Sequence, residues 1–496
     1  MKKIIYIFLT FHLVFYFYSC NESVLETIAT DRYNEANWWQ TESQAVSSLN
    51  GIYAVLRSTN TYQLNNISPN SLNMSGEVAL ATGAHNAGNE NLFRNMWNSN
   101  FRGVGRANNF LDNIDRLEID DDQINKMKAE ALFLRAFFYL NLVKYYGGVP
   151  LILESPDMNK HAKLPRNNKE EVITQILADL DNAASVLPLS YSDINVGRAT
   201  KGAALALKAR VLLYENRWEE AALAAKQVMD LNVYELFPDY RGLFALENEN
   251  NSEVIFDVQY KVPEYTHSWD IYFELQMNSA PTLDFVNSYL MKDGLPAEES
   301  PLFDPENPFE NRDPRLHKTV VVPGYLFNGN IANREKYFST GFGFKKYTSF
   351  KDEVYRPSFS PGTSEINFIV LRYADVLLMY AEARNEFAGP EDESIYTAVN
   401  QIRSRADMPE VPKGLDKDKL REIIRKERRV EMVLEQLYYD DIRRWRIADE
   451  VMNADVLNME GEVVQKRSFN PARDYLWPIH EVTIQENPVL EQNPGY

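Results

Sequence analysis

Side chains that could hold a hydroxyl-rich ligand concentrate in two stretches of the chain, 58–100 and 260–350. A flat aromatic ring can stack on a sugar ring, and the side chains of Asn, Arg and His can hydrogen-bond its hydroxyls. Loops on a rigid scaffold commonly carry such residues. The two stretches therefore predict a ligand-binding face. Its candidate contacts are Tyr62, Asn65, Asn73, His85, Asn91, Arg94, His267, Trp269, Tyr272 and Tyr325.

The sequence contains no strong catalytic motif. Its histidines are not spaced as paired metal ligands, and no His-Glu-x-x-His helix, Gly-x-Ser-x-Gly turn or phosphate-binding glycine loop is present. Acidic residues are abundant, however. A pair of carboxylates acting as acid and base in a helical glycoside hydrolase therefore stays open as an alternative.

The acidic run 118–122 has two interpretations. Hard carboxylate oxygens suit calcium, but the run lacks the glycine turn and the distal glutamate of a helix-loop-helix calcium site. It also precedes a helical pattern, where negative charge stabilises the N-terminus of the helix. We expect this second role, with no cofactor, and keep a structural calcium ion as the alternative.

The first twenty residues predict export and a lipid anchor. Lys2 and Lys3 precede an apolar run from Ile4 to Phe17, which is the layout of a secretory signal peptide. Cys20 follows and is the only cysteine, so it cannot form a disulfide within the chain. A cysteine at this junction is typical of bacterial lipoproteins. We expect residues 1–19 to be removed and Cys20 to carry the acyl chains that anchor the protein.

The charge of the chain excludes one class of partner. The formal net charge is −19, and loss of Lys2 and Lys3 with the signal peptide makes it −21. Such a chain is repelled by phosphate backbones, so nucleic acid is not expected as a partner. The content of 45% hydrophobic and 25% charged residues is ordinary for a globular protein.

Apolar residues recur every three or four positions in several stretches, which predicts amphipathic helices. The helical stretches are 124–146, 172–187, 201–231, 373–387, 395–406 and 416–438. Small residues and a central turn within 201–231 are typical of a tetratricopeptide-like helix hairpin, and 373–406 partly repeats this pattern. The sequence therefore predicts a mainly α fold on an interrupted helical-repeat scaffold.

The region 232–366 has a different character. Alternating apolar residues at 253–260 predict a β-strand, and Pro, Gly and Asn then interrupt the chain repeatedly. We expect an irregular, loop-rich region with short strands, inserted into the helical scaffold.

Two glutamates fall on or beside the apolar stripe of 416–438, at Glu427 and Glu431. A buried carboxylate needs a partner, so both are expected to form structural ion pairs with arginine rather than to act in a site. The arginines nearest in sequence are Arg428, Arg429, Arg443 and Arg444.

The order of several motifs resembles the SusD/RagB family of outer-membrane nutrient-binding lipoproteins of Bacteroidetes. The resemblance runs from the signal peptide to the last residue. The motifs are EALFLRAFFYLN at 130–141 with GGVP at 147–150, NRDPRL at 311–316, LRYADVLLMYAEA at 371–383, RKERRVE at 425–431 with DIRRW at 441–445, WPI at 477–479 and NPGY at 493–496.

This resemblance implies one domain over 20–496 with four tetratricopeptide-like units. Helical repeats would occupy about 38–231 and 367–445, and the irregular region 232–366 with the loops 58–100 would form the binding face. It also implies a surface protein that captures glycan and delivers it to a SusC/RagA-like TonB-dependent transporter. Some members bind peptides instead, and a scaffold that binds protein through its repeats is a further alternative, because the shared motifs do not identify the ligand.

Overall fold

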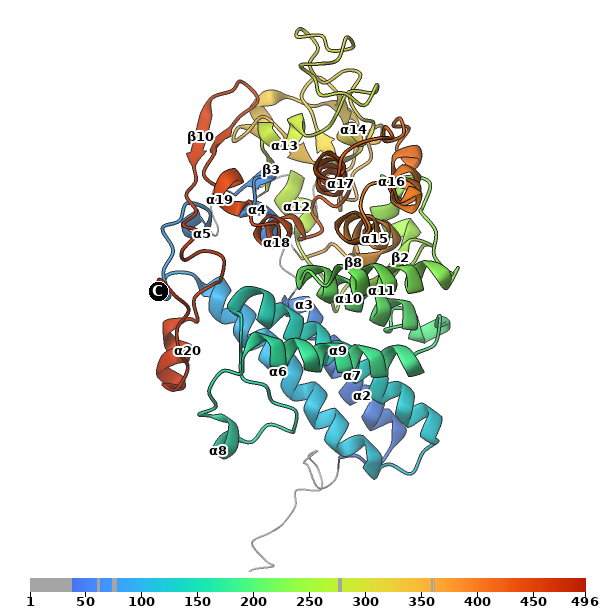
Figure 1. Cartoon of the computed structure of the whole chain (residues 1–496), viewed down its shortest axis with the longest axis vertical. Helices are drawn as coiled ribbons and strands as arrows, with labels where there is room; N and C mark the ends of the chain where they lie inside the picture. The colour runs from blue at the N-terminus through green and yellow to red at the C-terminus, as the bar shows by residue number, and fades with distance from the viewer. Residues whose placement is uncertain (1–37, 60–62, 74–77, 275–278, 358–359, 361) are drawn as a thin grey trace, which may run out of the picture.

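The chain is mainly helical, as the sequence predicts, with short strands between the helices (Figure 1). The computed structural model describes residues 38–496 apart from 60–62, 74–77, 275–278, 358–359 and 361. The α-helices of the first half are α2 (Glu42–Tyr53), α3 (Leu56–Thr59), α4 (Gln63–Asn66), α5 (Val78–Ala81), α6 (Asn91–Asn113), α7 (Asp121–Tyr146), α8 (Met158–His161), α9 (Lys169–Val186), α10 (Lys201–Tyr214) and α11 (Trp218–Asp230).

The second half alternates short and long helices. They are α12 (Trp269–Glu274), α13 (Leu283–Asn287), α14 (Arg315–Thr319), α15 (Tyr373–Phe387), α16 (Glu393–Arg405), α17 (Lys417–Glu431), α18 (Tyr438–Arg444), α19 (Ala448–Val451) and α20 (Glu481–Glu486). In the described part of the chain, no helix has the length and apolar character needed to cross a bilayer.

Helix α7 shows how local sequence sets the ends of an element. The Asp120 side chain accepts a hydrogen bond from the backbone N–H of Gln123 and so caps the first turn. The acidic run 118–122 thus lies at the helix N-terminus, as expected. Gly147 ends the helix at φ 75°, which glycine adopts without steric cost.

Among the described residues, no group of three or more His, Cys, Asp or Glu could hold a metal ion.

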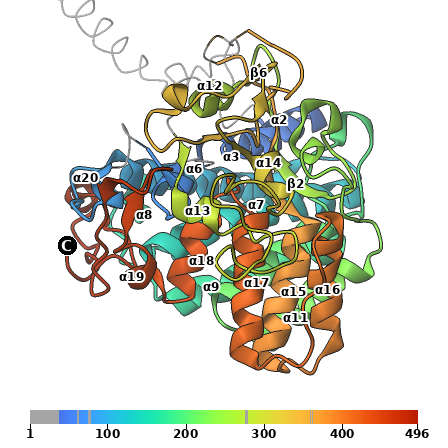
Figure 2. The same ribbon diagram turned by 90° about the horizontal axis from the view of Figure 1, so that it is seen from above.

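Neighbouring helices pack in sequence order from α6 through α7, α9 and α10 to α11. Buried alanines line both α10 and α11, and this confirms the predicted hairpin at 201–231. Helix α11 then packs against α15, although residues 231–372 separate the two in the chain. Figure 2 shows α15 beside α11, α16 and α17. The helical scaffold therefore continues across the inserted region.

The inserted region is irregular, as predicted, and its two ends are joined by strands. The strand predicted at 253–260 is β2 (Val254–Val258), and it pairs antiparallel with β8 (Phe368–Arg372). The rest of the region lies around α13 and α14 at the top of Figure 1. The other strands are β1 (Ser71–Leu72), β3 (Ala280–Pro281), β4 (Val320–Val321), β5 (Leu326–Phe327), β6 (Asn330–Ile331), β7 (Gly343–Phe344), β9 (Asp455–Leu457) and β10 (Val463–Lys466).

The stretch 58–100 is irregular only in part, because α6 begins at Asn91. Its buried face repeats at Phe93, Met96 and Asn100, and the Asn100 amide donates to the carbonyl of Met96 at 2.7 Å. The several asparagines between these positions made the stretch look like a loop in sequence. The prediction of loop structure up to residue 100 was therefore wrong at its C-terminal end.

The predicted continuous helix at 416–438 was also wrong. Helix α17 stops at Glu431, and Leu434 and Gln436 adopt left-handed conformations before α18 begins. Tertiary partners explain the break. The Tyr240 hydroxyl donates to the Glu431 carbonyl at 2.8 Å, and the Arg372 guanidinium donates to it at 2.9 Å. These donors satisfy a carbonyl that would otherwise need the next helical turn.

A buried ion network joins α17 to the inserted region. Arg372 is fully buried and bonds Glu253, Glu431 and Glu435, at 2.6, 2.6 and 2.8 Å. Burial alone would raise the pKa of Glu431, but Arg405, Arg372 and Arg315 outweigh it and hold that pKa well below its ordinary value.

The prediction of arginine partners for Glu427 and Glu431 is confirmed, but the expected arginines were wrong. Glu427 pairs with Arg315 at 2.6 Å and with Arg403 at 3.2 Å. The expected arginines are engaged elsewhere. Arg428 pairs with Asp375 and Asp441, and Arg429 pairs with Asp284. Arg443 donates to backbone carbonyls, and Arg444 pairs with Glu382. The actual partners of the two glutamates are Arg315, Arg372, Arg403 and Arg405.

Candidate functional site

Both candidate stretches contribute to one cavity of about 830 Å³. One wall comes from α3 and from the start of α6 with the residues before it. The other wall comes from the loop that leads into α12. The lining residues are Arg57, Ser58, Asn89, Glu90, Asn91, Leu92, Asn95, Met96, Tyr260, Glu264, Tyr265, Thr266, His267, Ser268, Trp269 and Tyr272.

Helix α6 places two amide side chains on the cavity wall. Asn91 is the first residue of the helix, and Asn95 follows one turn later on the same face. Both are exposed, and neither side chain has a hydrogen bond to another described residue. A primary amide both donates and accepts, so this pair can bind two hydroxyls along one edge of a ligand.

The opposite wall carries an exposed aromatic ring at Tyr265. The backbones of Lys261 and Tyr265 exchange two hydrogen bonds of 2.7 Å, which fix the loop that holds the ring. The Arg57 guanidinium lies 3.9 Å from the ring centroid, a cation–π contact across the two walls. Tyr265 keeps 51% of its surface exposed, so the ring offers apolar area to a ligand.

The floor is built from His267 and Trp269. The His267 Nε2–H donates to the Ile366 carbonyl at 2.9 Å, while Nδ1 accepts from the Trp269 backbone N–H at 3.2 Å. Burial lowers the pKa of His267 to about 4, so the imidazole is neutral at pH 7. The Trp269 ring packs edge-on against Tyr347 and Phe368 and is only 4% exposed. Trp269 therefore supports the floor more than it offers a stacking surface.

Four of the predicted contacts line this cavity, namely Asn91, His267, Trp269 and Tyr272. Tyr62 lies outside the described residues. The structure places the other five away from the cavity, in contacts of their own. Asn65 donates to the Ser71 hydroxyl at 2.7 Å, Asn73 is buried, His85 lies 2.8 Å from the Tyr496 hydroxyl, Arg94 pairs with Glu486 at 3.2 Å, and Tyr325 packs 4.2 Å from the His317 ring.

Sequence reasoning did not select Arg57, Asn95, Glu264 or Tyr265 as contacts. Asn95 had a usable signal, because its spacing of four from Asn91 places both on one helical face once α6 is recognised. Arg57 had none, because its role depends on a contact with Tyr265 that joins parts of the chain far apart in sequence.

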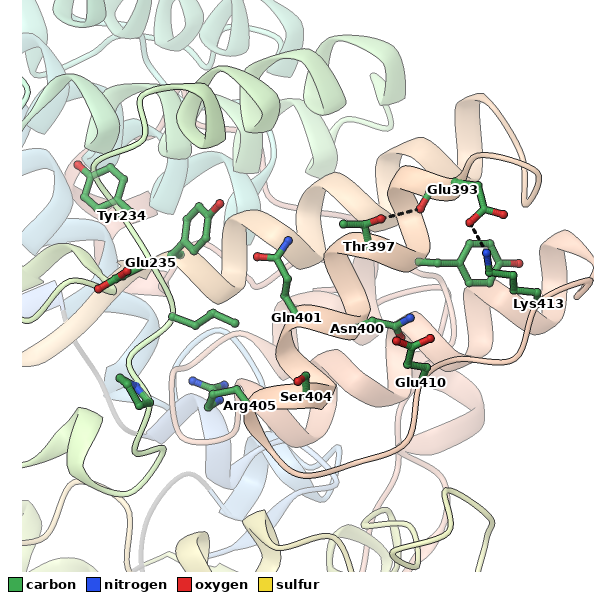
Figure 3. Close-up of a pocket in the computed structure, with 14 residues that line it drawn as sticks. Tyr234, Glu235, Glu393, Thr397, Asn400, Gln401, Ser404, Arg405, Glu410 and Lys413 are labelled. Carbon is green, nitrogen blue, oxygen red and sulfur yellow. Dashed lines mark hydrogen bonds and ion pairs between the residues drawn. The ribbon is translucent and has the colours of Figure 1, made fainter.

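A second groove, of about 820 Å³, runs along α16 (Figure 3). Two of its side chains are committed to the scaffold. Arg405 ion-pairs with Glu253 at 3.1 Å inside the buried network, and the Tyr234 hydroxyl lies 3.1 Å from that of Thr200. The cavity at Asn91 and Tyr265 combines two exposed amides with an exposed ring that Arg57 contacts, so it is the better candidate for a sugar-like ligand.

Comparison with known proteins agrees with this architecture. Residues 252–496 match the family model described as the SusD family, and residues 22–213 match one described as starch-binding and associating with the outer membrane. A SusD-like protein of Formosa agariphila is 26% identical, with 99% of each chain covered.

Solved structures are similar over almost the whole chain. A SusD-like protein of Bacteroides fragilis is 30% identical with a TM-score of 0.82, covering 94% of this chain and 99% of its own. A second structure from that organism, described as a SusD-like carbohydrate-binding protein, is 28% identical with a TM-score of 0.83, covering 92% of this chain and all of its own. Fold, family models and near-complete alignment agree, and the chain belongs to the SusD family.

Proposed function

We propose that this protein captures a glycan at the outer membrane and passes it to a partner transporter without chemical conversion. The observation that carries the proposal is the cavity between Asn91 and Tyr265. Relatives support the ligand class, since one of them is described as carbohydrate-binding and one matching family model as starch-binding. That model's description also supports a place at the outer membrane.

The cavity suits a sugar because it combines an apolar surface with hydrogen-bonding groups. The exposed face of Tyr265 can stack on the C–H face of a pyranose ring. The amides of Asn91 and Asn95 can then bind hydroxyls at the edge of that ring, where both donors and acceptors are needed. The cation–π contact of Arg57 holds the tyrosine ring in place and so limits the side-chain entropy lost on binding.

The carboxylates around the cavity support binding without conversion. Hydrolysis of a glycosidic bond needs two carboxyl groups facing each other across the bound sugar. Glu90 accepts a hydrogen bond from the Leu80 backbone N–H at 3.2 Å, so its carboxylate is engaged by α5. Glu264 is exposed on the opposite loop. This placement does not favour Glu90 and Glu264 as a facing acid and base pair.

The delivery step would use a SusC/RagA-like TonB-dependent transporter as the partner. Acylation at Cys20 would keep the protein beside that barrel, facing the cell exterior. Co-purification of the full-length protein with the barrel from detergent-solubilised outer membranes tests this part of the proposal. Recovery of the protein without any such barrel would contradict it.

Incubation with a panel of oligosaccharides and polysaccharides tests capture against conversion. We expect one class of glycan to be depleted from solution without any rise in reducing ends. New reducing ends would show a hydrolase instead. Depletion of peptides from a parallel peptide panel, with no glycan bound, would show that the cavity serves a peptide ligand.

A further inference from the structure

Another cavity, of about 440 Å³, is lined by an excess of cationic side chains, which is unusual in this acidic chain. It lies where the end of α7, the start of α9, the end of α10 and α18 meet. It shares no lining residue with the cavity at Asn91 and Tyr265. Six cationic side chains line it against two carboxylates, Glu215 and Asp440. The cations are Lys144, Arg166, Lys169, Arg443, Arg444 and Arg446.

Half of these cations are neutralised within the protein. Each of these three cations lies within 2.8 Å of at least one carboxylate oxygen, so it adds little net charge to the cavity. The pairs are Lys144 with Asp440, Lys169 with Glu215, and Arg444 with Glu382 and Asp441.

The other three cations have no carboxylate of their own. Arg166 donates to the carbonyls of Tyr146, Gly148 and Glu491 and to the Asn493 side chain. Arg446 is exposed and lies 4.3 Å from the Tyr475 ring centroid, with no ion pair to a described residue.

Arg443 is the third unneutralised cation. It donates to the carbonyls of Lys144 and Tyr475, and its nearest carboxylate oxygen is 3.7 Å away on Asp440, which already serves Lys144. The cavity thus keeps an excess of positive charge in a chain whose net charge is −19.

Three polar atoms on residues that line the cavity have no hydrogen-bond partner among the described residues, and each atom is almost completely shielded from solvent. They are the Arg443 Nε–H, the Tyr214 hydroxyl and the Asp440 Oδ1. Arg443 is only 6% exposed, so its Nε–H donor is shielded from bulk solvent. Buried polar atoms without a partner are costly, and a bound group that satisfied them would gain that cost as binding energy.

The chemistry of these atoms specifies the ligand. Two donors and an excess of guanidinium charge suit a compact oxyanion, to which arginine bonds strongly. The carboxylate oxygen of Asp440 needs a donor, which a phosphate carrying one O–H supplies and a sulfate does not. We propose that this cavity binds a phosphate group, either as the free ion or as a monoester on a sugar or a lipid.

Calorimetric titration of sodium phosphate into the full-length protein in detergent, at fixed ionic strength, tests the proposal. We expect saturable binding at one site, with sulfate about tenfold or more weaker because it cannot donate to Asp440. The double variant Lys169→Gln/Arg446→Gln should weaken phosphate binding about tenfold or more, because it removes the unneutralised Arg446 and leaves the Glu215 carboxylate without its partner at the cavity. Both residues are exposed, so neither substitution disturbs the core.

Arg116→Gln is the matched control, because Arg116 is an exposed arginine outside the cavity. It should bind phosphate as the unmodified protein does, and thermal melts should show that all variants are folded. Glucose 6-phosphate and short-chain phosphatidic acid distinguish the sources, since tighter binding of one than of inorganic phosphate would assign a sugar or a lipid.

Three outcomes would overturn the proposal. Phosphate heats no larger than those of chloride at equal ionic strength would show that there is no site. Equal losses in the double variant and in Arg116→Gln would show only general charge attraction. Sulfate binding as tight as phosphate binding would remove the role given to Asp440 and with it the assignment of phosphate. None of these outcomes bears on glycan binding at the other cavity.

Discussion

Glu427 shows how single side chains hold this fold together. Its carboxylate bonds Arg315 and Arg403, which come from α14 and α16, while Glu427 itself lies on α17. All three residues are at most 5% exposed. Removing Glu427 leaves the buried Arg403 without a carboxylate partner among the described residues, whereas Arg315 keeps Asp313 and Glu431. An unpaired buried charge costs far more than the net stability that the intact pair provides.

We therefore predict that Glu427→Ala lowers the free energy of unfolding by about 3–5 kcal/mol. Glu422→Ala is the matched control, because Glu422 lies on the same helix but pairs with Lys426 at the surface, with its side chain 63% exposed. Loss of this exposed pair should cost about 0.5 kcal/mol or less.

Urea unfolding followed by circular dichroism measures both changes. Equal and small effects of the two substitutions would show that the buried network contributes little. A Glu427 variant with unchanged stability but lost ligand binding would instead place Glu427 in a functional site.

Residue types alone could predict part of the site. The combination of rings and amides selected segments that line one candidate cavity, including Asn91, His267 and Tyr272. It could not tell exposed rings from buried ones. Trp269 and Tyr265 are four residues apart, yet one is 4% and the other 51% exposed. The difference depends on Tyr347 and Phe368, which pack against Trp269 from distant parts of the sequence.

At the scale of elements, the pairing of β2 with β8 buries the carboxyl group of Asp257 beside Asn367, and Glu249, which also bonds Asn367, is half-buried. The Asn367 backbone N–H donates to Glu249 at 2.7 Å, and its side-chain amide donates to Asp257 at 3.0 Å. No ion pair to a described residue compensates either group. Burial raises the pKa of Asp257 to about 6 and that of Glu249 to about 7.

The raised pKa of Asp257 predicts that the effect of Asp257→Asn on the free energy of unfolding depends on pH. The folded state holds the proton of Asp257 more tightly than the unfolded chain does. Ionisation of Asp257 therefore destabilises the fold increasingly as the pH rises from about 4 to 6. The amide is neutral throughout. The free energy of unfolding of the variant, minus that of the unmodified protein, should therefore rise by about 2–3 kcal/mol from pH 4 to pH 7.

Urea unfolding at several pH values measures this difference. Asp181→Asn is the control, because Asp181 is an exposed residue paired with Lys208 at the surface. A difference between Asp257→Asn and the unmodified protein that stays constant from pH 4 to 7 would show that Asp257 is not a proton-binding group of the fold.

Elements with uniform helical patterns could be predicted closely from the sequence. Helix α15 spans Tyr373–Phe387 as predicted, and α7 ends at Tyr146 before Gly147. The break after Glu431 could not be predicted, because the donors that satisfy its carbonyl belong to Tyr240 and Arg372. Local pattern sets the helix, and distant partners decide where it stops.

The whole molecule joins a continuous helical scaffold to a candidate binding face made from separate segments. The packing of α11 against α15 brings the two halves of the scaffold together, and the inserted region is held at its base by β2 and β8. The cavity then forms where this insert meets α3 and α6. A rigid support of this kind lets loops vary for different ligands without loss of the fold.

We predict that anchoring at the outer membrane, a property of the whole molecule, depends on one residue. Cys20 lies outside the described residues, and its role is predicted from the sequence. Cys20→Ala should move the protein from the membrane fraction to the soluble fraction and abolish labelling with a radioactive fatty acid. A variant that still pellets with membranes and still incorporates fatty acid would contradict the lipid anchor at Cys20.

Calorimetric titration of the captured glycan into cavity variants tests the central claim most directly. Tyr265→Ala and Asn91→Ala should each weaken binding about tenfold or more, with circular dichroism confirming the fold. Tyr355→Ala is the matched control, because Tyr355 is 66% exposed and does not line the cavity, and it should bind as the unmodified protein does. Unchanged affinity in both cavity variants, with loss of affinity on substituting exposed residues of 201–231, would contradict the account and place the site on the repeats.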